Sequence, residues 1–142
     1  MDRMYRLIDA DFNRAKEGLR VVEDILRFFF DDHRNSAACR QIRHELKDIV
    51  NIQQNRRILA SRCIETDYGK ELDPLELERS CVIDIMYSSF GRAKEALRVL
   101  EESYKIIDIE KVKGIKALRF RVYDLEKEVM LLCTASERTN DE

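Results

Sequence analysis

Two stretches of this 142-residue chain are near copies of one another, 78 positions apart. Residues 12–24 read FNRAKEGLRVVED and residues 90–102 read FGRAKEALRVLEE, so nine of the thirteen positions are identical. A buried apolar stripe accepts exchanges among Leu, Ile, Val and Met, so core packing alone does not keep Arg, Lys and Glu in register. The repeat therefore predicts a duplicated helix whose polar side chains have a role of their own.

The duplication extends to a second helix. Residues 42–49 (IRHELKDI) align with residues 118–125 (LRFRVYDL) at an offset of 76. A single helical hairpin cannot bury its apolar stripe, whereas two hairpins packed face to face can. We therefore predict an all-α fold of internally duplicated helical hairpins, forming a four- to five-helix bundle with pseudo-twofold symmetry.

The apolar periodicity and the capping residues divide this bundle further. We expect a single helical domain over residues 1–135, with repeat halves at about 6–59 and 75–134, a linking loop at about 60–74 and a flexible tail at 136–142. Within it, helices are expected over residues 9–30, 36–59, 75–107 and 109–134. Asp9 or Asp11 would cap the first and Asp108 the fourth, and the third is either one helix or two.

Composition and charge exclude several classes of function. The net charge of −2 gives no general attraction to nucleic acid or to an anionic membrane. The basic cluster of Arg56, Arg57 and Arg62 is too short to change that expectation. No apolar run reaches the length of a membrane span, and the four cysteines are widely scattered. We expect a cytoplasmic protein with reduced thiols and with neither nucleic acid nor membrane as a partner.

Arg14 and its copy Arg92 are exceptions to the helical pattern. At about 100° per residue, Arg14 falls between Val21 and Ile25 on the apolar side, and Arg92 falls beside Val99. A charge buried there must be paired or must reach a ligand. Two interpretations stay open: arginines that reach the surface or pair with a carboxylate of the other hairpin, and an anion site built from both.

A second polar row occupies the solvent side of each repeat. It consists of Asn13, Glu17, Arg20 and Asp24 in the first copy, and of Gly91, Glu95, Arg98 and Glu102 in the second. Such Glu and Arg spacings are typical of surface ion pairs, but their duplication also suits a functional site. His44 is open to the same two interpretations, a structural hydrogen bond or catalysis.

Several of these strings resemble one known family. They are residues 8–10 (IDA), 13–24, 43–44 (RH), 61–62 (SR), 67–69 (DYG), 92–102 and 118–127. Together they resemble a small all-helical domain of thiamin biosynthesis, described as a hydroxymethylpyrimidine phosphate kinase and often fused N-terminal to thiamine-phosphate synthase. The resemblance implies ATP-dependent phosphorylation of 4-amino-5-hydroxymethyl-2-methylpyrimidine phosphate to its diphosphate, with ATP and Mg²⁺ as cofactors.

The resemblance also implies the site residues, together with the chemistry of phosphoryl transfer. The catalytic candidates are Glu17, Arg20, Glu95, Arg98 and His44. The candidates for binding the substrate or its phosphates are Asn13, Arg14, Arg43, Arg62, Asp67, Gly69 and Arg92. Magnesium would bind through Glu17, Glu95 or Asp67.

Two departures from the family pattern limit these expectations. Cys63 follows Arg62 where the family tends to an acidic residue, which weakens the case for a carboxylate in this loop. A (β/α)₈ synthase barrel needs roughly 200 residues or more, so we do not expect synthase activity from these 142 residues.

Two other functions remain as alternatives. The chain could be a non-catalytic helical partner that binds thiamine-phosphate synthase in trans. It could also be a homodimer in which the Glu17/Arg20 and Glu95/Arg98 rows meet across the dimer axis.

Overall fold

The computed structural model describes residues 1–140, apart from the side chains of Glu76 and of residues 137–140. Over this range it is helical and contains no strand, which confirms the all-α prediction. The α-helices are α1 (Asp2–Asp24), α2 (His33–Val50), α3 (Arg56–Ala60), α4 (Val82–Ile107) and α5 (Val112–Asn140). A π-helical turn, η1 (Ile25–Phe29), extends α1, and the 3₁₀ turns are η2 (Tyr68–Lys70), η3 (Pro74–Leu77) and η4 (Ile109–Lys111).

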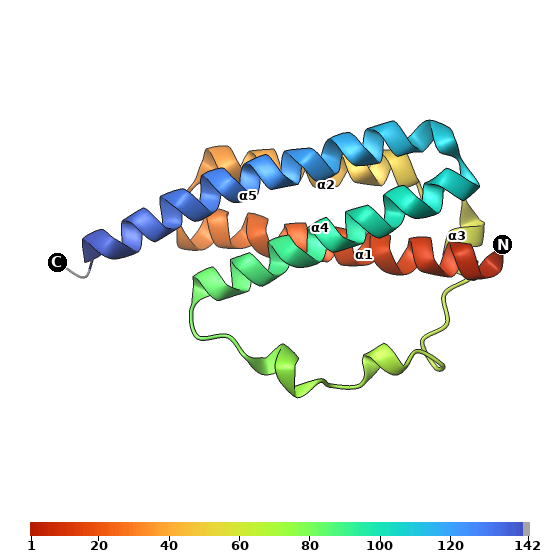
Figure 1. Ribbon diagram of the computed structural model, residues 1–142, viewed down its shortest axis with the longest axis horizontal. Coiled ribbons are helices and arrows are strands. Elements are labelled where there is room, and N and C mark those ends of the chain that lie inside the picture. The colour runs from red at the N-terminus through yellow and green to blue at the C-terminus, as the bar shows by residue number, and fades with distance from the viewer. Residues whose placement is uncertain (141–142) are drawn as a thin grey trace.

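The four long helices form two layers. Figure 1 shows α1 and α4 in one layer and α2 and α5 in the other. Helix α1 packs against α4 and α2, while α5 packs against α4 and α2. The core lies between them and takes fully buried side chains from every long helix, among them Leu19, Leu46, Leu97 and Val122. The apolar stripe of each long helix is thereby buried against its two neighbouring helices.

The first two helices begin earlier than their sequence signals suggest. Helix α1 starts at Asp2, so Asp9 and Asp11 are not its caps; both lie inside the helix and are only 4% and 3% exposed. Helix α2 starts at His33, because the Asp32 carboxylate accepts the backbone N–H of Asn35 at 3.0 Å. Asp9 and Asp11 are instead paired with the arginines Arg62 and Arg14, as described below.

Other boundaries also differ from the predicted ones. Helix α2 ends at Val50 because Asn51 adopts the left-handed conformation with φ 45°, and a separate short helix, α3, follows. Helix α4 begins at Val82 rather than near residue 75, and it is one continuous helix. Asp108 caps the turn η4 directly before α5.

Helix α5 continues to Asn140, past the expected start of the tail at residue 136, and residues 141–142 lie outside the described part of the chain.

Helices α1 and α4 lie close together at Gly18. A Cβ atom at this position would lie 2.7 Å from the backbone oxygen of Ser89 and 3.5 Å from the Cβ of Ala93. Atoms at 2.7 Å overlap, so only glycine permits this separation of the two helices. The second repeat has Ala96 at the equivalent position of α4. Close packing of α1 against α4 therefore explains why the first repeat has glycine there.

The segment between α3 and α4 lies apart from the layers. Figure 1 shows it running from one end of the bundle to the other, beside the α1–α4 layer. At its start, the Arg6 guanidinium donates to the carbonyl oxygen of Cys63 at 3.3 Å. At its end, the Ser80 backbone N–H donates to Asp84 at 3.1 Å. The segment is thus fixed at both ends and leaves space beside α4.

No helix within residues 1–140 is long and apolar enough to cross a membrane.

Candidate phosphate-binding site

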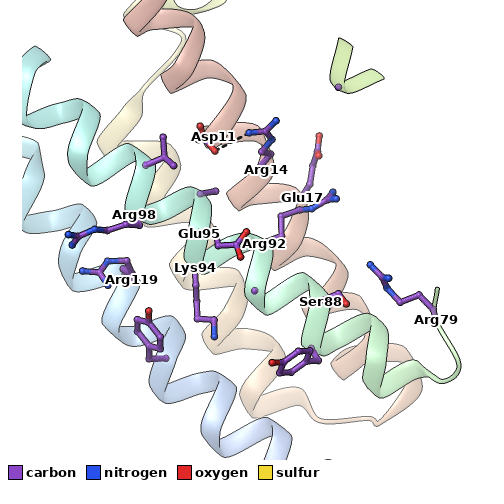
Figure 2. Close-up of a pocket in the computed structure, with 16 residues that line it drawn as sticks. Asp11, Arg14, Glu17, Arg79, Ser88, Arg92, Lys94, Glu95, Arg98 and Arg119 are labelled. Atoms are coloured by element: carbon purple, nitrogen blue, oxygen red, sulfur yellow. Dashed lines mark hydrogen bonds and ion pairs between the residues drawn. The ribbon is translucent and has the colours of Figure 1, made fainter. Parts of the chain in front are cut away.

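An open pocket of about 1350 Å³ lies along α4. We call it the trough. Its walls come from α1, α4, α5 and the segment between α3 and α4, and Figure 2 shows its charged side chains. Its lining consists of Asp11, Arg14, Glu17, Gly69, Arg79, Tyr87, Ser88, Gly91, Arg92, Lys94, Glu95, Ala96, Arg98, Val99, Arg119 and Tyr123.

The charge of the trough is strongly unbalanced. Six of its lining residues are basic, namely Arg14, Arg79, Arg92, Lys94, Arg98 and Arg119, whereas three are acidic, namely Asp11, Glu17 and Glu95. Arginine guanidinium groups bind phosphate oxygens two at a time. This arrangement therefore suits a ligand that carries phosphate groups.

Arg14 and Arg92 both line the trough, but neither is buried. The prediction that they lie on the buried apolar side is wrong: both are exposed. The reason is that the apolar residues next to Arg14 around the helix are not all part of the buried core, since Val21 is 39% exposed. Figure 2 shows Arg14 on α1 and Arg92 on α4 reaching the same trough.

Arg92 is the cation with the fewest protein partners in the trough. It forms no ion pair with any residue that the structure describes, and it is exposed. Arg14 lies 3.4 Å from the carboxylate of Asp11, one turn away on the same helix. Arg14 is the exposed member of this pair, with 56% of its side chain exposed, and it keeps N–H groups that Asp11 does not use and that can bind a ligand phosphate. Both arginines are therefore available to an anion.

Asp11 gives the trough a carboxyl group in an apolar setting. It is buried, and its Oδ2 atom has no hydrogen-bond partner. Burial raises the pKa of Asp11, although the neighbouring Arg14 opposes that shift. The Asp11 carboxyl group therefore takes up a proton at a higher pH than a solvated aspartate would.

The remaining cations of the trough on α4 and α5 have carboxylate partners. Lys94 Nζ lies 2.8 Å from Glu126, and Arg119 Nε donates to Glu101 at 2.8 Å. Arg98 lies 3.4 Å from Glu101 and 3.1 Å from Glu102. These pairs hold the side chains in place, and each arginine keeps further N–H groups for a ligand.

Six of the residues predicted from the sequence line the trough: Arg14, Glu17, Gly69, Arg92, Glu95 and Arg98. The other six do not, namely Asn13, Arg20, Arg43, His44, Arg62 and Asp67. Most of these have partners elsewhere. Arg20 lies 3.3 Å from Asp24 on its own helix, and the Asp67 carboxylate accepts the backbone N–H of Gly69 at 2.9 Å. His44 is exposed on α2.

Asn13, Arg43 and Arg62 lie outside the trough and bind polar groups of α1 instead. The Asn13 amide donates to the Asp9 carbonyl at 2.9 Å, and Arg62 makes two bonds of 2.7 Å to the Asp9 carboxylate. Arg43 Nη2 lies 3.0 Å from Glu23. The phosphate ligands predicted from the sequence thus do not converge on one place.

Four charged residues of the trough were missed by sequence reasoning. Lys94 and Arg119 belong to the repeated strings, so their duplication was an available signal. Asp11 was interpreted as a helix cap. Arg79 lies in the irregular segment, where no sequence pattern marked it.

The trough carries carboxylates that suit a magnesium–nucleotide complex. Magnesium is usually bound by one or two carboxylates together with substrate phosphates. Glu17 and Glu95 supply two such groups, one from α1 and one from α4 (Figure 2). Among the side chains that the structure describes, no group of three or more His, Cys, Asp or Glu residues could hold a metal ion on its own. The residues present therefore fit a metal ion that arrives with a nucleotide.

The comparisons with known proteins agree with one another. The profile of the ThiD2 family matches residues 6–128. The chain is 38% identical over 130 residues to a thiamine-phosphate synthase of Thermosynechococcus vestitus, covering 91% of this chain and 36% of that protein. It is 36% identical over 128 residues to that of Nostoc punctiforme, covering 89% and 35%. For that of Gloeobacter violaceus the identity is 38% over 122 residues, covering 85% and 35%.

The chain thus spans about a third of the length of these relatives. No solved structure matches it significantly.

Proposed function

This chain belongs to the ThiD2 family, and we propose that it catalyses the ATP-dependent phosphorylation of hydroxymethylpyrimidine phosphate to the diphosphate. Its relatives named thiamine-phosphate synthase associate the chain with thiamin biosynthesis. The kinase activity is the expectation from the sequence resemblance. The single observation that best supports it is the trough, in which Arg92 lacks a carboxylate partner among the described residues and faces the same space as Arg14.

In this proposal the arginines hold the phosphates of both substrates. Phosphoryl transfer asks a protein mainly to position the reactants and to stabilise the charge on the transferred group. Arg14 and Arg92 would bind the phosphate groups nearest the reaction, and Arg98 and Arg119, already oriented by Glu101, would bind those further along α4. The six basic side chains of the trough outnumber its three acidic side chains, which favours the binding of phosphate groups there.

The carboxylates of the trough have two tasks. Glu17 and Glu95 would hold Mg²⁺, directly or through water, and the ion would bridge and neutralise phosphate oxygens when bound. The same carboxylates would orient the attacking hydroxymethyl group of the pyrimidine. His44 and Asp67 do not line the trough, so we assign neither task to them.

A coupled ADP-release assay tests the proposal. The protein is supplied with Mg²⁺-ATP and hydroxymethylpyrimidine phosphate, with the unphosphorylated pyrimidine in a parallel reaction. We expect ADP to form with the monophosphate and not with the unphosphorylated pyrimidine. A folded sample that forms no ADP with either compound would contradict the kinase proposal.

A second candidate function is binding to thiamine-phosphate synthase without catalysis. It is favoured by large apolar side chains exposed on α1, η1 and α4: Leu7 is 41% exposed, and Phe28 and Ile106 are each 69% exposed. Exposed apolar surface often marks a protein interface. A stable complex with purified synthase, observed by gel filtration, together with no ADP formation, would favour this candidate. The same measurement on the protein alone tests a homodimer.

A further inference from the structure

We propose that Gly91 and Tyr87 of α4 form a subsite in the trough for the flat heteroaromatic ring of a phosphorylated ligand. Both residues line the trough, and they lie one turn apart on the same face of α4. The inference rests on the proposed function, because it takes the trough as the substrate site. It goes further by giving the ring of a substrate a place, whereas the arginines account only for its phosphates.

Nothing in the fold requires glycine at position 91. Gly91 lies inside α4 and its φ is not positive, so a residue with a side chain could adopt its conformation. A Cβ atom there would meet no neighbouring group within 4 Å, so packing does not exclude a side chain either, in contrast to Gly18. Glycine in the interior of a helix is destabilising relative to alanine. The space that Gly91 leaves open is part of the trough, where a ligand can use it.

A side chain at position 91 would cover Tyr87. Helical side chains point back toward the preceding turn, so the side chain of residue i+4 lies over residue i. The first repeat shows this arrangement, with Asn13 at the position of Gly91 and Asp9 at the position of Tyr87. The Asn13 amide reaches back to Asp9 and donates to its carbonyl oxygen at 2.9 Å and to its carboxylate at 3.3 Å. In α4 glycine removes this cover, and Tyr87 is 64% exposed.

Tyr87 is the tyrosine of the trough that is available for stacking. The other, Tyr123 of α5, already contacts Lys94, whose Nζ lies 5.2 Å from the ring centre, and Arg119, whose guanidinium carbon lies 6.0 Å from it. Tyr87 makes no ring contact or cation–π contact with a residue in the described part of the chain. An exposed aromatic ring in a pocket provides a surface on which a flat base stacks.

The cations proposed to bind phosphate are close to this subsite along α4. Arg92 is the residue after Gly91, and Lys94 follows one turn later (Figure 2). Arg98 lies two turns beyond Gly91, about 10 Å along the helix axis. A ligand with its ring at Gly91 can therefore place a phosphate near Arg92, and a chain of phosphates can extend toward Arg98. Hydroxymethylpyrimidine phosphate and ATP both combine a flat ring with phosphate, so the experiment must distinguish them.

Isothermal titration of wild-type, Gly91→Leu and Tyr87→Leu protein tests the subsite. Each protein is titrated with Mg²⁺-ATP, with hydroxymethylpyrimidine phosphate and with Mg²⁺-tripolyphosphate, which has phosphates but no ring. A leucine side chain at position 91 fills the space of the ring, and Tyr87→Leu removes the stacking surface. We expect both variants to bind at least one of the two ring-bearing ligands roughly tenfold more weakly, as the loss of one base–aromatic stack implies. They should bind tripolyphosphate like the wild type.

Three controls separate the ring from general effects of substitution. Ala117→Leu enlarges an exposed side chain of α5 outside the trough, and it should bind all three ligands like the wild type. Tyr87→Phe keeps the ring and should do the same. Thermal unfolding should show Gly91→Leu to be at least as stable as the wild type, because leucine favours a helix more than glycine does.

The outcomes distinguish this inference from the kinase proposal. Wild-type affinity of Gly91→Leu and Tyr87→Leu for both ring-bearing ligands overturns the subsite, whether or not the wild type forms ADP. An equal loss of tripolyphosphate affinity also overturns it, because the effect would then not concern the ring. The expected loss of affinity together with no ADP formation by the wild type would support the subsite and contradict the kinase activity. A wild type that binds none of the three ligands overturns both.

Discussion

Glu101 and Arg119 form a buried ion pair at 2.8 Å, and their counterparts in the first repeat, Glu23 and Arg43, form the same pair at 3.0 Å. Both glutamates are less than 5% exposed. In each half the pair joins the first helix of a hairpin to the second. Part of the duplication of polar residues therefore has a structural reason, because each of these pairs holds the two helices of its hairpin together. The duplicated polar residues without such a structural role, above all Arg14 and Arg92, are the ones available for function.

Breaking the Glu101–Arg119 pair of the second repeat should strongly destabilise the fold. Glu101→Ala leaves the Arg119 guanidinium, whose side chain is 11% exposed, without its carboxylate. Removing one partner of a buried pair costs about 3 kcal/mol or more. Urea denaturation measures this loss. Glu102→Ala, which removes the exposed neighbouring carboxylate, should reduce the free energy of unfolding much less. Equal losses in the two variants would show that the buried pair contributes no more stability than an exposed carboxylate.

Gly18 and Gly91 should respond to alanine in opposite directions. Gly18→Ala places a Cβ atom 2.7 Å from the Ser89 backbone oxygen, so α1 and α4 must separate, at a cost of about 1–3 kcal/mol. A Cβ at Gly91 meets nothing within 4 Å, so Gly91→Ala should stabilise α4 by about 0.5–1 kcal/mol. Thermal unfolding followed by circular dichroism compares them. Stabilisation by both changes would mean that the two helices are not in close contact at Gly18.

The Cys39 thiol should make stability fall at alkaline pH. Burial raises its pKa from 9.0 to about 12, so between these values the unfolded chain loses a proton that the folded chain keeps. Stability therefore decreases as the pH rises above about 9, by about 1.4 kcal/mol at pH 10. Urea denaturation at pH 8 and pH 10 measures the decrease. Cys39→Val should remove this part of the pH dependence, and an unchanged dependence in that variant would exclude the thiol as its source.

Much of the fold follows from the sequence because the repeat is long and strongly periodic. Each half buries a continuous stripe such as Ala15, Leu19 and Val22, and one such stripe needs another to cover it. The pseudo-twofold symmetry stays a prediction. Helix starts were less predictable: Asp9 and Asp11 have the chemistry of caps, yet Arg62 and Arg14 are their partners. These contacts join residues that the local pattern cannot relate.

The candidate site was only partly accessible to sequence reasoning. The repeated strings marked Glu17, Arg92 and Arg98, because polar letters recurred there. They could not separate the two sides of α1, so Arg43 and Arg62 were grouped with residues that lie elsewhere. The position of Arg62 depends on the path of the chain after α3, which has no periodic pattern to predict it.

Arg92→Ala is the variant that addresses the trough most directly. Arg92 is exposed and has no ion pair with the described residues, so its loss should leave the stability nearly unchanged. One lost charge-assisted phosphate contact of about 1.5–3 kcal/mol corresponds to roughly 10- to 100-fold weaker binding. Arg40→Ala is the matched control, since it removes an exposed arginine of α2 that has no ion pair with the described residues.

The decisive measurement is isothermal titration of wild-type, Arg92→Ala and Arg40→Ala protein with Mg²⁺-ATP and with hydroxymethylpyrimidine phosphate. If the trough is the phosphate-binding site, at least one of the two ligands binds Arg92→Ala 10- to 100-fold more weakly, while Arg40→Ala binds both like the wild type. Wild-type affinity of Arg92→Ala for both ligands would contradict that account.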